Sequence, residues 1–164
     1  MDSVIKESGM DFIAENTFHI EKSELYRNLG ESVRSVEFVR VKDDKLLFVE
    51  AKITFPNPNN PSVENFAKYQ AEIDEICDKF IHSLNLFSSV KVGVAKNAFT
   101  GDFVLPEKVT LMFILVIKEH ELIWCKRIKE TLMDALPLYL KRIWDPTVWV
   151  INQEVAAKYN LVIS

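Results

Sequence analysis

The alternation of apolar and polar residues predicts a chain of strands and helices. Its clearest part is a pair of Val- and Phe-rich runs, residues 35–42 and 45–55, separated by the polar pair Asp43-Asp44. Strand-forming residues on both sides of a short polar turn predict a β-hairpin. From Ser62 onward the apolar residues recur at spacings of three, four and seven, which predicts an amphipathic helix of about six or seven turns.

The remaining pattern supplies the other elements of the fold. Residues 109–117 are apolar without alternation, which predicts a central strand buried on both faces. We further expect a short helix over 2–14, a strand over 17–20, a turn at Gly101-Asp102, a helix over 121–144 that Pro137 kinks or splits, a strand over 147–151 and a helical turn over 154–159. A hairpin followed by a crossover helix and a parallel strand indicates an α/β fold, with a mixed β-sheet sandwiched by helices.

Composition narrows the classes of protein that this pattern allows. The chain has 164 residues, of which 48% are hydrophobic and 27% charged, so we expect a single globular domain over 1–164 rather than a disordered or low-complexity chain. The two cysteines, Cys77 and Cys125, predict buried small apolar side chains rather than a disulfide or zinc framework, and hence a cytoplasmic protein. Neither a secretion signal nor a membrane-spanning segment is expected.

The net charge of the chain limits which partners it can attract. The formal net charge is −4 and the pI is near 5.5, so the molecule as a whole does not attract polyanions. Any nucleic-acid binding therefore requires a local site. The basic residues of the second long helix (Lys126, Arg127, Lys129, Lys141 and Arg142) could face a phosphate backbone, although a solvated helix face explains them as well.

The predicted hairpin brings two carboxylates together. A turn centred on Asp43-Asp44 pairs Val41 with Leu46, Val39 with Phe48, and Glu37 with Glu50. Glu50 and Lys52 then share the face of Val39, Val41, Leu46 and Phe48, whereas Val36, Phe38, Leu47, Val49 and Ala51 line the opposite face. Two carboxylates about 5 Å apart repel by roughly 3 kcal/mol at an effective dielectric near 20, which indicates a neighbouring cation, such as Lys52 or a divalent metal ion.

These residues resemble the PD-(D/E)XK nuclease superfamily, which includes restriction endonucleases and archaeal Holliday-junction resolvases. An apolar strand ends in Glu50-Ala51-Lys52, and an acid stands at residue 37 on the neighbouring strand. The order of elements over about two thirds of the chain is similar to that family's core. The sequence departs from the family pattern at Glu37, where Asp is usual, and at Val36, where Pro is common.

The resemblance implies a metal-dependent nuclease with a restriction-endonuclease-like core. Glu37 and Glu50 would bind Mg²⁺, for which Mn²⁺ can substitute, and the Ala51 carbonyl would be a further ligand. Lys52 would position the attacking water or stabilise the transition state in hydrolysis of a DNA phosphodiester. Glu7 and Glu15 are candidates for the acid that the family's first helix often adds, and the loop over 56–61 would border the site.

Two other interpretations remain open. The chain could be a non-catalytic member of the same fold that binds a protein partner or assembles into a homo-oligomer, using its acidic surface and exposed aromatic residues such as Trp144 and Trp149. It could also be an unrelated α/β domain in which the hairpin acids simply pair with lysines.

Overall fold

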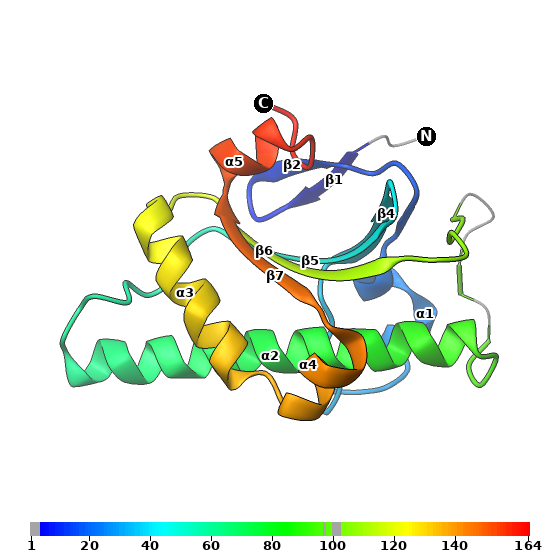
Figure 1. The fold of residues 1–164 in the computed structure, drawn as a ribbon, viewed down its shortest axis with the longest axis horizontal. Helices are drawn as coiled ribbons and strands as arrows, with labels where there is room; N and C mark the ends of the chain where they lie inside the picture. Colours follow the sequence, from blue (N-terminus) through cyan, green and yellow to red (C-terminus); the bar gives the residue numbers. More distant parts are fainter. Residues whose placement is uncertain (1–3, 97, 100–102) are drawn as a thin grey trace.

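The computed structural model describes residues 4–96, 98–99 and 103–164, and it has a mixed α/β fold (Figure 1). The strands are β1 (Val4–Glu7), β2 (Met10–Ile13), β3 (Thr17–Phe18), β4 (Phe38–Lys42), β5 (Lys45–Lys52), β6 (Thr110–Ile117) and β7 (Thr147–Asn152). The helices are the 3₁₀ helix η1 (Ile20–Lys22), α1 (Glu24–Arg27), α2 (Val63–Lys91), α3 (Leu122–Ala135), α4 (Leu138–Trp144) and α5 (Gln153–Lys158). The turn expected at Gly101-Asp102 lies outside the described residues.

The main sheet has the order β3-β4-β5-β6-β7. Its first three strands are antiparallel, and β6 and β7 then add parallel to β5. The predicted hairpin register is confirmed, because Val39 pairs with Phe48 and Val41 pairs with Leu46. The predicted crossover is confirmed as well, since α2 connects the parallel neighbours β5 and β6.

The hairpin strands are shorter than the sequence predicted. The backbone N–H of Val36 donates to the Ser83 hydroxyl of α2 at 2.8 Å, so the chain leaves the ladder before β4. Val36 consequently packs in the core on the α2 side, and its predicted position on the opposite face is wrong. The second strand ends at Lys52 rather than at residue 55, and Ile53 beyond it is exposed.

The expected helix at the N-terminus is wrong. Its described part forms a separate two-stranded antiparallel sheet, β1–β2, with Ser8 and Gly9 at the turn. Both turn residues have positive φ, of 50° and 70°, as a tight hairpin turn requires. Met10 and Phe12 alternate with polar residues and are buried, and this alternation outweighs the weak helical spacing.

The helices agree with the sequence-based predictions more closely than the N-terminal segment does. Ser62 caps α2, since its hydroxyl accepts a hydrogen bond from the N–H of Asn65 at 3.1 Å. The helix runs about eight turns, longer than predicted because Val90 extends its buried face. Pro137 separates α3 from α4, which confirms the predicted break. Among the described residues, no helix combines the length and apolarity needed to cross a membrane.

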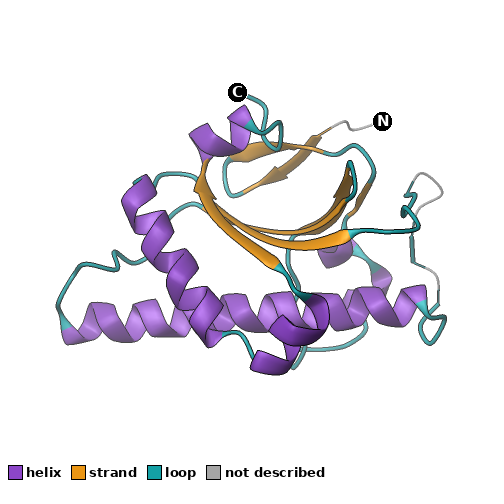
Figure 2. Ribbon diagram, viewed as in Figure 1, coloured by secondary structure: helices purple, strands orange, loops and turns teal. Residues whose placement is uncertain are grey.

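The sheet separates two apolar clusters of buried side chains, and Figure 2 shows helices on both sides of it. Helices α2, α3 and α4 pack on one face, and the β1–β2 hairpin and α5 pack on the other. Strand β6 lies between β5 and β7 and is buried on both faces, as predicted. Cys77 and Cys125 are also buried as predicted, and burial raises the pKa of their thiols to about 12 and about 11.

Phe80 provides a test of the α2 core. Its ring is fully buried and stacks on Phe113 of β6 with the ring centroids 4.6 Å apart. We expect Phe80→Ala to lower the free energy of unfolding by about 3–5 kcal/mol in urea titrations, because it leaves a cavity. Phe66 lies on the same helix and is 65% exposed, so the control Phe66→Ala should change stability by only about 0.5 kcal/mol. Equal losses would contradict this packing.

Candidate metal centre

Two carboxyl groups are buried where adjacent strands of the hairpin meet. Glu50 lies near the end of β5 and is 1% exposed, and Glu37 immediately precedes β4 and is 8% exposed. The N–H of Glu37 donates to the Val49 carbonyl at 3.0 Å, which holds the two residues at the same end of the hairpin. The paired residues of the hairpin end at Phe38 and Val49, one residue before the predicted pair of Glu37 and Glu50, which still interact electrostatically.

Three further residues extend this site. Glu7 ends β1, His19 follows β3, and Glu21 lies in η1. One ligand atom from each lies within 4.8 Å of the others, and the His19 Nε2 and Glu7 Oε1 atoms are 3.7 Å apart. Glu21 also shares a side-chain hydrogen bond with Glu37, so the group continues into the buried acids.

The cation nearest to Glu50 is Lys79 of α2. Its Nζ donates to Glu50 Oε1 at 2.6 Å. Burial raises the pKa of Glu50 to about 7, even though Lys79 and Lys52 favour its charged form. Burial alone would lower the pKa of Lys79, yet the neighbouring carboxylates together raise it. One ammonium group therefore compensates only part of the buried acidity.

Glu37 is the more strongly perturbed acid. Burial, its hydrogen bond with Glu21 and repulsion from Glu50 raise its pKa to about 10. At neutral pH without a metal ion, Glu37 is therefore protonated, and its proton can be donated to the Glu21 carboxylate. This arrangement removes one negative charge from the cluster without a bound cation.

Buried atoms without partners make the centre suitable for a cation. Within the described part of the chain, Glu37 Oε2, Glu50 Oε2 and His19 Nε2 are buried and have no hydrogen-bond partner. An unsatisfied buried acceptor is costly, by about 1–3 kcal/mol or more for a charged group. Carboxylate oxygens are the ligands that Mg²⁺ and Mn²⁺ prefer, so the Glu37 and Glu50 oxygens fit the ion that the sequence resemblance implies.

The other expected site residues have partners of their own. The Lys52 Nζ lies 3.2 Å from Glu72 and 3.9 Å from Glu75, both on α2, although its charge still lowers the pKa of Glu50. The Ala51 carbonyl accepts a hydrogen bond from the Ser8 hydroxyl at 3.0 Å. Of the two candidate acids near the N-terminus, Glu7 belongs to the cluster, whereas Glu15 interacts with Arg40.

Three residues of the centre were not found from the sequence. Lys79 stands between the apolar positions Ile76 and Phe80 on the buried side of α2, and a lysine so placed indicates a buried acidic partner. His19 and Glu21 follow β3, and only the pairing of β3 with β4 brings them beside Glu37.

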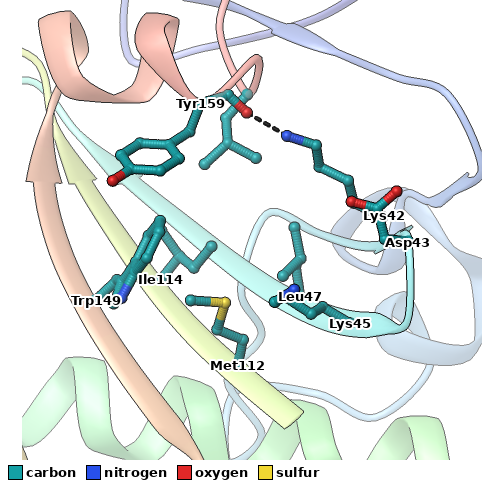
Figure 3. Close-up of a pocket in the computed structure, with 9 residues that line it drawn as sticks. Lys42, Asp43, Lys45, Leu47, Met112, Ile114, Trp149 and Tyr159 are labelled. Carbon is teal, nitrogen blue, oxygen red and sulfur yellow. Dashed lines mark hydrogen bonds between the residues drawn. The ribbon is translucent and has the colours of Figure 1, made fainter. Parts of the chain in front are cut away.

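An apolar cavity lies elsewhere. It has a volume of about 240 Å³ at the turn end of the hairpin, where Leu47 and Met112 belong to the core on the side of β1, β2 and α5 (Figure 3). The Lys42 ammonium donates to the Tyr159 carbonyl at its rim. Trp149, which was expected to be exposed, is half-buried and packs against Tyr159 with the ring centroids 4.8 Å apart. None of the acids of the candidate centre lines this cavity.

Comparisons with known proteins identify no relative: no family model, no curated protein and no solved structure matches the chain. The site must therefore be interpreted from its own geometry and chemistry.

The buried ion pair gives a stability prediction. We expect Lys79→Met to lower the free energy of unfolding by about 3–5 kcal/mol without metal, because it leaves the Glu50 carboxyl buried without its cation. Lys68 is an exposed lysine of the same helix, paired with Glu64, and Lys68→Met should cost less than about 1 kcal/mol. Urea unfolding in a chelating buffer measures both, and similar losses would contradict the role of Lys79. Lys79→Met/Glu50→Gln should recover most of the stability.

The raised pKa of Glu37 gives a pH-dependent prediction for the metal-free protein. The pKa of this carboxyl group is raised from 4.5 to about 10 in the folded state, so the folded protein holds the proton more tightly than the unfolded chain does. The resulting contribution to stability is complete below the unfolded-state pKa and is lost as the pH rises toward 10. We therefore expect Glu37→Gln to raise the thermal midpoint at pH 8 by about 2 °C or more and to weaken the fall in stability between pH 5 and pH 9. A lower midpoint at pH 8 in chelating buffer would contradict the assignment.

Proposed function

We propose that this protein is a metal-dependent phosphodiesterase that hydrolyses DNA. The observation that carries the proposal is the pair of buried carboxyl groups, Glu37 and Glu50, each with an oxygen that lacks a partner among the described residues. A stable fold has no need to bury two adjacent acids at a sheet end, whereas a metal centre requires them.

The arrangement of elements supports a restriction-endonuclease-like core. Strands β3, β4 and β5 form an antiparallel meander, and α2 then leads to the parallel strand β6. This is similar to the order that the resemblance to the PD-(D/E)XK superfamily implies. The β1–β2 hairpin stands where that family has its first helix, and it supplies Glu7 in place of a helical acid.

The proposed roles follow from the contacts. Glu37 and Glu50 would hold Mg²⁺ or Mn²⁺, with the Ala51 carbonyl as a further oxygen ligand. The bound ion would supply Lewis acidity and lower the pKa of a water molecule. Glu72 and Glu75 hold the Lys52 ammonium beside the centre, where it would favour the ionised form of Glu50 and orient the attacking water. Lys79 would neutralise Glu50 when no metal is present.

A DNA backbone could approach along α3 and the loop after β5. The Arg127 guanidinium donates to the Asn59 side chain at 2.9 Å and so joins α3 to that loop. Lys126 and Lys129 are exposed on the same helix. These cations supply the local positive charge that a chain of net charge −4 requires for contact with phosphates.

One observation favours the second candidate, a non-catalytic protein-binding module. Helix α4 exposes Leu138, Tyr139, Ile143 and Trp144, with exposed fractions of 44–71%. Apolar residues gathered on one short helix are typical of a protein contact. In this alternative, the Lys79–Glu50 ion pair is the permanent state of the centre rather than its metal-free state.

Cleavage of DNA with and without metal distinguishes the two candidates. We expect the wild type to cut linear, branched or single-stranded DNA in Mn²⁺ and not in chelator. Glu50→Gln should reduce the rate about a hundredfold or more, because it removes a charged ligand. Glu130→Gln, which changes an exposed acid of α3, should retain the full rate.

Calorimetric titration of Mn²⁺ provides the second readout. Binding to the wild type that is lost in Glu50→Gln supports the metal centre. No binding to either protein, together with no cleavage, would overturn the proposed function and favour the protein-binding module.

A further inference from the structure

The cluster beside the buried acids contains a nitrogen ligand. The His19 Nε2 atom is buried and has no hydrogen-bond partner within the described residues, and it lies 3.7 Å from Glu7 Oε1. An imidazole nitrogen without a hydrogen-bond partner, next to a carboxylate, is suited to metal coordination.

Three elements position this ligand among oxygens. The end of β1 supplies Glu7, the residue after β3 is His19, and η1 supplies Glu21, with one ligand atom of each within 4.8 Å of the others. The side chains of Glu7 and His19 are 20% and 31% exposed, so an ion can enter from solvent. The group is therefore both compact and accessible.

A buried carboxyl group independently points into the same cluster. Glu37 is 8% exposed, its pKa is raised by burial and by interaction with Glu21, and its Oε2 atom has no hydrogen-bond partner in the described part of the chain. It therefore borders the cluster, although it is not one of the three residues whose ligand atoms lie within 4.8 Å of one another. The cluster differs in this respect from exposed acids that gather only at a surface.

We propose that Glu7, His19 and Glu21 bind a divalent transition-metal ion such as Zn²⁺ or Co²⁺, next to the buried Glu37 carboxyl group. Imidazole coordinates these ions readily, whereas Mg²⁺ prefers oxygen ligands alone. The inference goes beyond the proposed function, because it assigns a second ion-binding position, with its own ligands, next to Glu37 and Glu50. The binding itself does not require that the protein cleave DNA.

Calorimetric titration of Zn²⁺ and the visible spectrum of the Co²⁺-loaded protein test this site. We expect the wild type to bind one ion of either metal more tightly than Mg²⁺. His19→Asn should weaken Zn²⁺ binding about tenfold or more, since even residues that only support a ligand account for 10–100-fold. His19→Asn should also change the Co²⁺ absorption bands, because a nitrogen ligand is lost.

His120 provides a matched control. Its Nε2 atom is likewise buried without a partner in the described residues, but His120 is not part of the three-residue group that could hold a metal ion. His120→Asn should therefore leave Zn²⁺ affinity unchanged. Glu21→Gln provides a second variant of the site, and thermal unfolding of every variant verifies that it folds.

The outcomes separate this site from the proposed function. Zn²⁺ affinity that falls in both His19→Asn and Glu21→Gln supports the site, even if the wild type cuts no DNA and the phosphodiesterase proposal fails. Zn²⁺ affinity that is unchanged in both variants, or no Zn²⁺ binding by the wild type, would overturn the site. In that case, DNA cleavage with Mg²⁺ that depends on Glu50 would still support the phosphodiesterase.

Discussion

The burial of the Glu50 carboxyl is the constraint on which the rest of the site depends. A carboxyl group that is 1% exposed on a sheet strand requires either a proton or a nearby cation, because desolvation penalises its charged form. Lys79 supplies a cation at 2.6 Å, but Glu37 adds a second buried acid that Glu50 repels. Burial raises the pKa of both acids, and Glu37 is protonated, so the centre carries less negative charge than two ionised carboxylates would give it.

The topology of the sheet explains why these groups meet. The ends of β3 and β5 and the start of β4 lie at the same end of three adjacent antiparallel strands. Helix α2 crosses beneath them and carries Glu72, Glu75 and Lys79, which pair with Lys52 and Glu50. On the other side, the β1–β2 hairpin brings Ser8 onto the Ala51 carbonyl. The acidic centre therefore joins the β4–β5 hairpin to three segments that are distant from it in sequence: the β1–β2 hairpin, β3 and α2.

The sequence predicts the parts of the fold that a strong local pattern specifies. The β4–β5 register follows from Asp43-Asp44, the start of α2 follows from Ser62, and Pro137 divides α3 from α4. The N-terminal hairpin was missed, because its strands have four residues each and depend on the positive φ of Ser8 and Gly9. Val36 was assigned to the wrong face, because its N–H bonds to Ser83 of α2, which no local pattern shows.

The site residues could likewise be predicted only where a local sequence pattern specifies them. Glu37 and Glu50 were identified by strand register, a local property of the hairpin. The centre acquires Lys79, His19 and Glu21 only through tertiary packing. Glu21 lies 16 residues from Glu37 in the sequence, and Lys79 lies 29 residues from Glu50. The sequence therefore indicated the acids correctly as neighbours, but not the residues that compensate their charge.

The most direct test of this account is a crystal structure of the Mn²⁺-soaked protein with anomalous diffraction data. The account predicts an anomalous peak within coordination distance of Glu37 and Glu50, with the Lys79 ammonium displaced from the Glu50 oxygen. A centre without an anomalous peak, in which Lys79 still donates to Glu50, would contradict the claim that these buried acids exist to hold a metal ion.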